Sequence, residues 1–328
     1  MDKNSLPYLK SIDLSKRILE IGPLMDPIVP KSEEAPFVYY ADIRSTKDII
    51  EIYRHDPNVD RKQIVGIDFV VSESYSKTFR DVEPFDYIIM RHVIEHVPQL
   101  ILFFQDVSTA LRDGGKLLLT IPDARFSFDH CRTPTSFAEL YDIYKRGDGI
   151  SAARVLDSIL CVDMSSNIED QPDLLTNYLH VPNGHGTANV AIQAYNAAIE
   201  GEKFDVHFGV FSPATFLLNT YYMTEAGLFP YEVSEYYVPD GFSIEFHATL
   251  TKNESIQNVK EEQDSHLKKI AQRLAEINED QSKVFDPQRN NAMLDHISYL
   301  SRELSLMANS FSWKSTGWIR KLAKRARK

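Results

Sequence analysis

The sequence predicts a doubly wound α/β fold that carries an insertion between its strands and a helical extension at its carboxyl end. Three observations lead to this prediction. The first 122 residues alternate short apolar runs with helix-like segments, as in a parallel sheet that is buried on both faces. Residues 123 to about 205 break this alternation. One helix and two strands then follow, and they are expected to close the sheet with an antiparallel edge hairpin.

Five strands and two helices are predicted within residues 1–122. Ser45, with Asp48 three residues later, is a typical N-cap for a helix over 45–55. A second helix over 98–112 is expected to stop at Gly114. The predicted strands are 17–21, 37–41, 63–71, 85–90 and 116–121.

The segment after residue 122 is rich in Asp, Asn, His, Gly and aromatic residues, and we expect it to cover the carboxyl edge of the sheet. It contains helical stretches near 137–145 and 188–200. The sheet pattern resumes at Ser212-Pro213, an N-cap followed by a proline in the first helical position, which opens a helix to about residue 226. Strands 231–238 and 242–251 follow.

Beyond residue 252, apolar residues recur at heptad spacing within 267–277 and 293–307, for about two heptads each. This pattern favours either two amphipathic helices or a short coiled coil that could form a homo-oligomer. The patterns together divide the chain into a core at 1–122, an insertion at 123–211, a closing helix and hairpin at 212–252, amphipathic helices at 253–310 and a basic aromatic tail at 311–328.

The composition excludes several classes of protein. Hydrophobic residues make up 43% of the 328 residues and charged residues 25%, which is typical of a soluble globular chain rather than a disordered one. Two cysteines, Cys131 and Cys161, exclude a disulfide scaffold. No apolar run approaches the ~20 residues of a spanning helix, and Met1–Ser5 lacks the apolar core of a signal peptide. We therefore expect a cytoplasmic protein.

Charge is distributed unevenly along the chain. The net charge is −11, so most of the surface should repel nucleic acid, and no nucleic-acid partner is expected. Seven of the 36 basic residues, however, lie within Lys314–Lys328, a stretch without an acidic residue. This end of the chain could attract an anionic surface.

Three segments resemble class I S-adenosylmethionine-dependent methyltransferases, of the kind found with bacterial surface-polysaccharide biosynthesis. They are Ile18–Gly22, Phe85–Val97 and Leu111–Pro122. The resemblance covers roughly residues 15–125 and 212–251. It implies a Rossmann-like methyltransferase sheet with S-adenosyl-L-methionine bound at the carboxyl ends of the strands, where sheets of this kind bind ligands.

The resemblance implies cofactor-binding roles for Glu20, Gly22, Asp42, Asp68, Phe69, Arg91 and His92. Asp42 would accept hydrogen bonds from the ribose hydroxyls, and Asp68 would contact the adenine amino group. The alternatives are a helix-entry cap for Asp42 and a plain strand end for Asp68. The chain departs from the family after Gly22, where Pro23–Met25 replace the other glycine positions. A nicotinamide site is disfavoured because no G-x-G-x-x-G follows the first strand.

Methyl transfer to a hydroxyl group needs a general base, and a histidine has a suitable pKa at neutral pH. His96 is the first candidate because it follows the fourth strand; His92 is a further possibility, as are His130 and His207 from the insertion. Alternatively, His96 and its neighbour Glu95 only brace the loop. No metal is expected, because His92 and His96 lie at a strand-to-loop transition and the cysteine spacing is not that of a zinc site.

The insertion and the tail indicate the acceptor. Residues 123–132 mix charged and aromatic side chains, which suits a polyhydroxylated ligand; alternatively, Phe126 and Phe128 are core residues. The expected activity is O-methylation of a sugar of a bacterial surface glycan or its precursor. The alternatives are methylation of a small metabolite, which would predict an apolar pocket, and a non-catalytic scaffold in glycan assembly.

The tail, residues 311–328, resembles the Ser-x-Ser-Trp-Lys/Arg-x-Thr segments that end many bacterial polysaccharide-building glycosyltransferases and methyltransferases. Trp313 and Trp318 stand among basic residues, a combination that suits an anionic membrane interface. We therefore expect peripheral contact with the inner face of the cell membrane or with glycan-assembly proteins. The alternative is a solubilising basic end.

Overall fold

A computed structural model describes residues 6–8, 12–147, 151–162, 186–239 and 243–284. Its central element is a seven-stranded sheet of order β3-β2-β1-β4-β5-β7-β6. The strands are β1 Ile18–Ile21, β2 Val38–Asp42, β3 Phe69–Val70, β4 Phe85–Arg91, β5 Leu111–Pro122, β6 Tyr231–Tyr237 and β7 Glu245–Lys252. The first five run parallel, and β7 lies antiparallel between β5 and β6. The predicted fold class is confirmed.

The centre of the sheet is apolar on both faces, as expected when helices or loops cover a parallel sheet from both sides. Ile18, Leu19, Ile88 and Leu118 are fully buried. Strand order reverses between β1 and β4, because β2 and β3 extend the sheet on one side and β5 on the other. Ligands of doubly wound sheets bind at the carboxyl ends of the strands at such a reversal.

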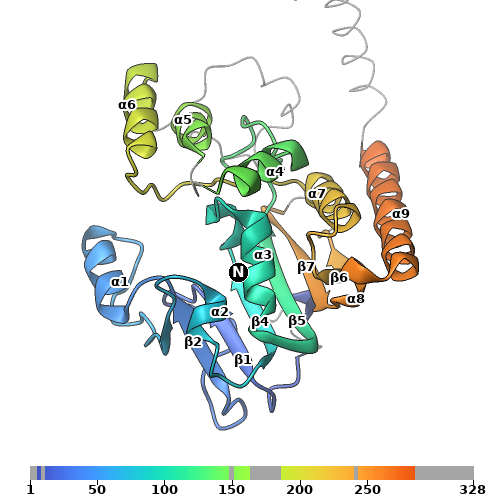
Figure 1. Cartoon of the computed structure of the whole chain (residues 1–328). Coiled ribbons are helices and arrows are strands. Elements are labelled where there is room, and N and C mark those ends of the chain that lie inside the picture. Colours follow the sequence, from blue (N-terminus) through green and yellow to red (C-terminus); the bar gives the residue numbers. More distant parts are fainter. Residues whose placement is uncertain (1–5, 9–11, 148–150, 163–185, 240–242, 285–328) are drawn as a thin grey trace, which may run out of the picture. The chain divides into compact units, whose positions relative to one another are not determined.

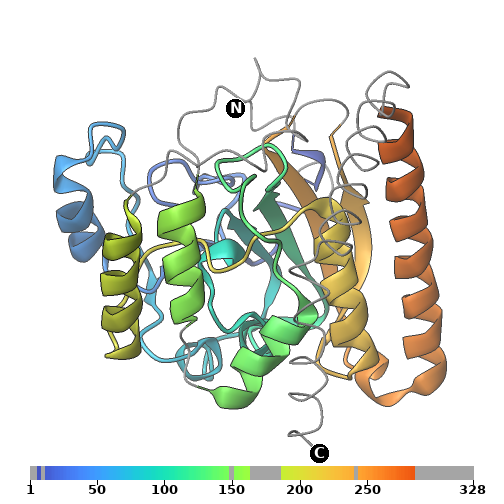
Figure 2. The same cartoon turned by 90° about the horizontal axis from the view of Figure 1, so that it is seen from above.

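Helices occupy one face and the carboxyl end of the sheet. The helices of the core are α1 Thr46–Ile52, α2 Tyr75–Thr78, α3 Leu100–Ser108 and α7 Pro213–Glu225, with short 3-10 turns η3 Tyr53–His55 and η4 Ile94–His96. The insertion forms α4 Phe137–Arg146, α5 Ala152–Cys161 and α6 Ala188–Ile199. These three lie beyond the carboxyl ends of β4 and β5 (Figure 1), and α5 and α6 run side by side (Figure 2).

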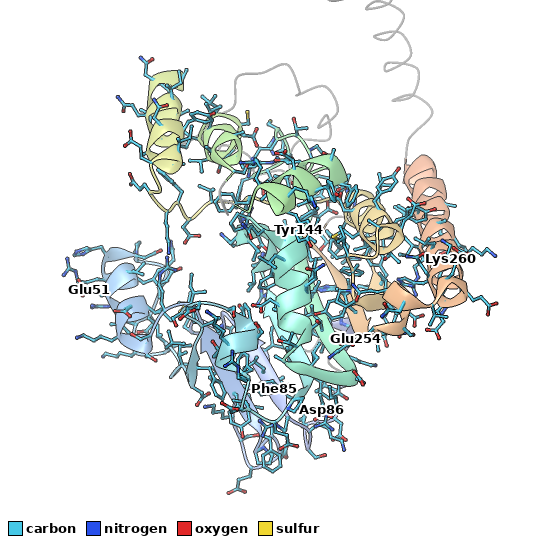
Figure 3. The ribbon with its side chains drawn as sticks, viewed as in Figure 1. Glu51, Phe85, Asp86, Tyr144, Glu254 and Lys260 are labelled. Atoms are coloured by element: carbon cyan, nitrogen blue, oxygen red, sulfur yellow. The ribbon has the colours of Figure 1, made fainter. Side chains whose placement is uncertain are left out.

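The direction of the strands is clear from the labelled side chains. Phe85 and Asp86, at the amino end of β4, lie at the end of the sheet opposite Tyr144 of α4 (Figure 3). The insertion therefore lies over the edge at which a ligand is expected. Local sequence explains how the chain returns from the insertion to the core at α7. Ser212 and Thr215 form a capping box at the start of this helix, and Pro213 occupies its first turn.

Several elements differ from their predicted bounds. The third strand was expected over 63–71, but β3 covers only Phe69–Val70, so Asp68 precedes the strand and does not end it. The strand β5 starts at Leu111, and Gly114, at φ +71°, lies within it beside a register shift in its pairing with β4. Helix α5 was not predicted. It is amphipathic and begins at Ser151, whose side chain accepts the N–H of Arg154.

The segment after β7 continues as α8 Ser255–Asn258 and α9 Lys260–Val284. Contacts divide the chain into residues 1–274 and 275–328, and only 275–284 of the second unit are described. Within the first unit, His266 accepts the N–H of edge-strand residue Val233 at 3.3 Å, and Arg273 donates to the carbonyl of Ser234 at 3.0 Å. The predicted amphipathic segment 293–307 and the tail 311–328 lie outside the described residues. No helix of the described part has both the length and the apolarity to span a bilayer.

Candidate functional site

The loop after β1 folds back onto its own strand. The buried carboxylate of Glu20 accepts the backbone N–H groups of Ile28 at 2.7 Å and Val29 at 3.1 Å. Gly22 has φ +69°, and a Cβ atom there would lie 3.1 Å from Cγ2 of Val93. Glycine is therefore required where β1 ends, whereas the carboxylate of Glu20 holds the loop in place.

Asp42 lies beside this turn, at the carboxyl end of β2. The strands pair with Ile21 opposite Ala41, and the N–H of Gly22 donates to the carbonyl of Ala41 at 2.9 Å. Oδ1 of Asp42 accepts the N–H of Arg44 at 2.9 Å. Burial raises the pKa of the Asp42 carboxyl. The structure thus brings Gly22 and Asp42 together at the point where strand order reverses.

Asp68 and Phe69 are engaged by other parts of the protein. Both carboxylate oxygens of Asp68 lie 2.7 Å from Nζ of Lys31, and one accepts the N–H of Tyr40 at 2.7 Å. The ring of Phe69 packs edge-on against Phe79, with centroids 5.1 Å apart. The structure does not place these side chains with Gly22 and Asp42, and their adenine contacts stay predictions.

Arg91 and His92 mark the carboxyl end of β4. Nη1 of Arg91 lies 3.7 Å from a carboxylate oxygen of Asp26 in the loop after β1, and its buried Nε has no hydrogen-bond partner among the described residues. His92 has φ +53°, and its Nε2 lies 2.8 Å from Oε2 of Glu245. Burial alone would lower the pKa of His92, but Glu245 and Glu95 outweigh burial and raise the pKa to about 9. His92 is therefore a cation at neutral pH.

A cluster of Glu95, His96 and His207 lies next to this strand end; we call it the histidine cluster. Glu95 and His96 come from η4, whereas His207 comes from the far end of the insertion. The two imidazole rings meet edge to face, with centroids 4.7 Å apart. One side-chain oxygen or nitrogen of each of the three residues lies within 4.8 Å of the others. Two of the three predicted catalytic histidines thus come together from distant parts of the chain.

His130, the third predicted catalytic histidine, has a different environment. It is largely buried, and its Nδ1 lies 3.0 Å from the carbonyl oxygen of Ser127. The structure does not place it in the histidine cluster, and a catalytic role for it stays a prediction.

Each histidine of the cluster has a carboxylate at Nδ1. This atom of His96 lies 3.0 Å from Oδ1 of Asp205, and that of His207 lies 2.6 Å from Oδ2 of Asp129. Burial would lower the pKa of His96, but Asp205 and Glu95 outweigh burial and raise it. Burial would raise the pKa of Asp129, but His207 and Arg132 outweigh burial and lower it.

The insertion is tied to the core by close backbone contact at the cluster. The N–H of Gly209 donates to the carbonyl of Glu95 at 2.8 Å, and a Cβ atom on Gly209 would lie 2.4 Å from Cε2 of Phe211. A glycine here lets the chain that carries His207 pass directly over η4. Sequence reasoning missed Asp129, Asp205 and Gly209, because no periodicity or motif links them to the fourth strand.

The segment that follows β5 carries charged and aromatic side chains, one of which contacts the histidine cluster. The ring of Phe128 lies 4.9 Å from that of His207 and is 38% exposed, so Phe128 is not a core residue. Arg125 forms an ion pair with the buried Asp123 at 2.6 Å and lies over the ring of Phe126. This surface can offer hydrogen bonds and ring contacts to a polar ligand.

Comparisons with known proteins agree with this geometry. A family model described as a methyltransferase domain matches residues 3–185. A search of curated protein sequences returns no significant match.

Three similar solved structures have low sequence identity to this chain. A putative zinc-dependent alcohol dehydrogenase of Rhodobacter sphaeroides aligns at 12% identity over 77% of this chain and 90% of its own, with a TM-score of 0.41. A putative S-adenosylmethionine-dependent methyltransferase of Listeria monocytogenes aligns at 12% identity over 75% of this chain and 96% of its own, with a TM-score of 0.34. Human N-acetylserotonin methyltransferase, solved with S-adenosylmethionine, aligns at 11% identity over 77% of this chain and 52% of its own, with a TM-score of 0.34. The chain spans about half the length of that human enzyme.

Proposed function

The chain belongs to the methyltransferase domain family, and on this premise we propose that it O-methylates a sugar of a bacterial surface glycan or of its precursor. The observation that carries the proposal is the histidine cluster, which joins the carboxyl end of β4 to the insertion. A methyltransferase with S-adenosylmethionine as its cofactor needs a place of this kind, where a hydroxyl acceptor can lose its proton.

Three residues at the carboxyl ends of β1, β2 and β4 fit the cofactor. Gly22 provides a turn at positive φ where a Cβ would press against Val93, Asp42 provides a carboxylate, and Arg91 provides a buried Nε without a described partner. When bound, S-adenosylmethionine supplies an activated methyl group. The chain itself must then align the acceptor, exclude water and remove a proton.

The histidine cluster suits proton removal from a hydroxyl. S-adenosylmethionine held by Gly22, Asp42 and Arg91 would supply the methyl group, and the acceptor oxygen would take it from sulfur, which would keep the electron pair of the broken bond. The hydroxyl proton must leave as this happens. Asp129 is hydrogen-bonded to Nδ1 of His207, and a histidine held in this way presents Nε2 to its ligand. Asp205 is an ion-pair partner of His96, with its Oδ1 3.0 Å from Nδ1. The acceptor hydroxyl is therefore expected to bind beside the two rings, which are themselves in edge-to-face contact.

A sugar acceptor is favoured by the groups beside the cluster. Half-exposed Phe128 offers a ring face next to His207, and the Asp123–Arg125 ion pair lies in the same segment. Sugars are commonly bound by such combinations of aromatic rings and charged hydrogen-bonding groups. An apolar metabolite would instead need a pocket lined mainly by hydrophobic side chains.

The link to glycan assembly at a membrane rests on the tail, 311–328, which lies outside the described residues. Each basic residue near an anionic surface contributes about 1 kcal/mol. We expect the full chain to co-sediment with anionic vesicles at low salt, to detach at high salt, and to bind neutral vesicles weakly. A truncation at Ser310 should lose this binding. Equal binding by both chains would remove the tail from membrane contact.

Labelled methyl transfer from S-adenosylmethionine into total cell glycan, with and without this protein, tests the proposed activity. Calorimetric titration with S-adenosylhomocysteine runs beside it. Binding together with labelled glycan supports the proposal. Binding without label in any glycan would show that the acceptor is another molecule, and absence of binding would favour a scaffold over an enzyme.

A further inference from the structure

We propose that Glu95, His96 and His207 bind a divalent transition-metal ion such as Zn²⁺. The three side chains meet within 4.8 Å although they come from two separate parts of the chain. The inference deepens the proposed function, since the ion would act on the acceptor at the histidine cluster. Binding of the ion itself does not depend on which acceptor is methylated.

The donor set suits such an ion. Two imidazole nitrogens and one carboxylate oxygen are ligands that zinc and related ions accept, whereas Mg²⁺ and Ca²⁺ prefer oxygen alone. Three protein ligands leave coordination positions open. A bound acceptor could fill these positions with its oxygens.

The carboxylate of Glu95 is a second and independent observation. Its side chain is 1% exposed, and neither oxygen has a hydrogen-bond partner among the described residues. Its one described ion-pair contact is Nδ1 of His92, at 3.4 Å from Oε1. A buried carboxylate is costly unless a cation and hydrogen bonds compensate it. An ion beside His96 and His207 would satisfy the remaining oxygen.

The partners of the two histidines form the surroundings that a metal site needs. Histidine ligands usually donate their other ring N–H to a carboxylate, which fixes the ring and makes the coordinating nitrogen more basic. Asp129 stands at Nδ1 of His207 in this way, at 2.6 Å. Nδ1 of His96 lies 3.0 Å from Oδ1 of Asp205, an ion-pair contact without a hydrogen bond. Asp129 is in turn held by the fully buried Arg132, whose Nη1 lies 2.8 Å from its Oδ1.

From the sequence we expected no metal. His92 and His96 drew attention by their spacing, but His92 pairs with Glu245 through Nε2. The third ligand, His207, reaches the cluster only because the insertion returns over η4 at Gly209.

A bound ion would supply the acidity that O-methylation requires. A hydroxyl oxygen that coordinates the ion becomes more acidic, as metal-bound water does, and its proton can pass to solvent water. The oxygen then attacks the methyl carbon while the oxidation state of the ion stays the same. His96 and His207 would thus promote proton loss through the ion and need not hold the proton themselves.

The test uses the full chain after treatment with a chelator. Zn²⁺ is titrated by calorimetry, and Co²⁺ is added in parallel because its visible absorption reports imidazole ligation. We expect saturable binding in both titrations. Asp129→Asn removes a carboxylate that contacts a ligand histidine but not the ion, and it should weaken metal binding by ~10–100-fold. Glu95→Gln and His207→Ala change ligands of the ion itself, and each should weaken metal binding by more than this. His55→Ala, which removes an exposed histidine of η3, is the matched control and should bind as the wild type does.

The outcomes separate this inference from the proposed activity. Absence of binding in the wild type, or equal binding in Glu95→Gln, His207→Ala and wild type, overturns the metal site. Absence of the imidazole-bound Co²⁺ spectrum in the wild type overturns the site even when a variant fails to fold. Binding at the cluster without methylated glycan leaves the metal site standing and removes the sugar acceptor. Full methylation by the chelated, metal-free chain would remove the ion from the reaction.

Discussion

The sheet and the insertion hold their polar groups by different means. At the carboxyl end of the sheet, backbone groups satisfy the side chains: Glu20 accepts two N–H groups of the loop that follows it. In the insertion, side chains satisfy one another: Arg132 pairs with Asp129 and Asp157 at 2.8 Å each and has no exposed side-chain surface. The loop after β1 therefore depends on local chain geometry, whereas this part of the insertion depends on buried ion pairs.

The cofactor end and the acceptor end of the site differ in the same way. The cofactor end of the site follows from short segments whose backbone turns are fixed by their own sequence, such as Gly22 after β1. The acceptor end needs η4 from the core and His207 from the insertion at once. Changes to the insertion should therefore alter the reaction and the stability of the chain more than they alter cofactor binding.

The largest expected effect is on turnover. His96→Ala should lower turnover by ~10²–10⁴-fold, because the acceptor hydroxyl then loses the group that promotes removal of its proton. Affinity for S-adenosylhomocysteine should stay nearly unchanged, since His96 lies beyond the cofactor residues. Turnover is measured with labelled methyl donor, and affinity by calorimetry.

His207→Ala tests the contribution of the insertion, because His207 is the residue that the insertion adds to the histidine cluster. Turnover should fall about as much as in His96→Ala if the two histidines act together. A loss below tenfold with an unchanged pH profile, in either variant, would place proton removal elsewhere, and His130 would be the next residue to test.

The next effect is on stability. Arg132→Met should lower the free energy of unfolding by about 3–5 kcal/mol, because buried Asp129 then keeps only His207, and half-buried Asp157 only Arg154, as a cationic partner. Lys31→Met is the matched change in the sheet region, where the Lys31–Asp68 pair is partly exposed, and it should cost at most ~1 kcal/mol. Urea unfolding measures both. Equal losses would show that the two regions are stabilised in the same way.

The same contrast explains which features the sequence could predict. The seven strands, the antiparallel hairpin and the caps at Ser45 and Ser212 depend on periodicity and on residues within four positions of one another, and all are present. The third strand was predicted too long because the apolar run 63–71 was taken as strand, although only Phe69–Val70 pair with β2. Asp68 consequently lies before the strand, paired with Lys31.

The contacts of the insertion could not be predicted in this way. The pairs Asp129–His207 and Arg132–Asp157 join residues from separate segments, and their spacing in the chain follows no repeat. His96 and His207 were both named as candidates by residue type, but their meeting depends on the path of the chain through Gly209. The catalytic and cofactor roles of the site residues stay predictions.

A smaller effect is the loss of folding stability as pH falls. His266 of α9 accepts the N–H of Val233, and burial lowers its pKa to about 4. Because the native pKa lies below the unfolded value near 6.5, this contribution to stability is present above pH 6.5 and is lost as pH falls toward 4. The loss should reach about 2–3 kcal/mol. His266→Gln should remove this part of the pH dependence in urea unfolding measured from pH 7 to 4; an unchanged slope would contradict the neutral imidazole.

The smallest expected effect tests the cofactor end of the sheet. Asp42 lies beside Gly22, and a carboxylate there can accept hydrogen bonds from hydroxyl groups of the cofactor. Asp42→Ala should therefore weaken S-adenosylhomocysteine binding by roughly 1–3 kcal/mol, the scale for losing hydrogen bonds to a charged group. Asp48→Ala, at an exposed carboxylate in the first turn of α1, is the matched control and should bind as the wild type does. Because the insertion contributes none of these contacts, His207→Ala should also retain affinity. Unchanged affinity in a folded Asp42→Ala chain would remove Asp42 from the site and would leave Gly22 and Arg91 as the residues that fit the cofactor.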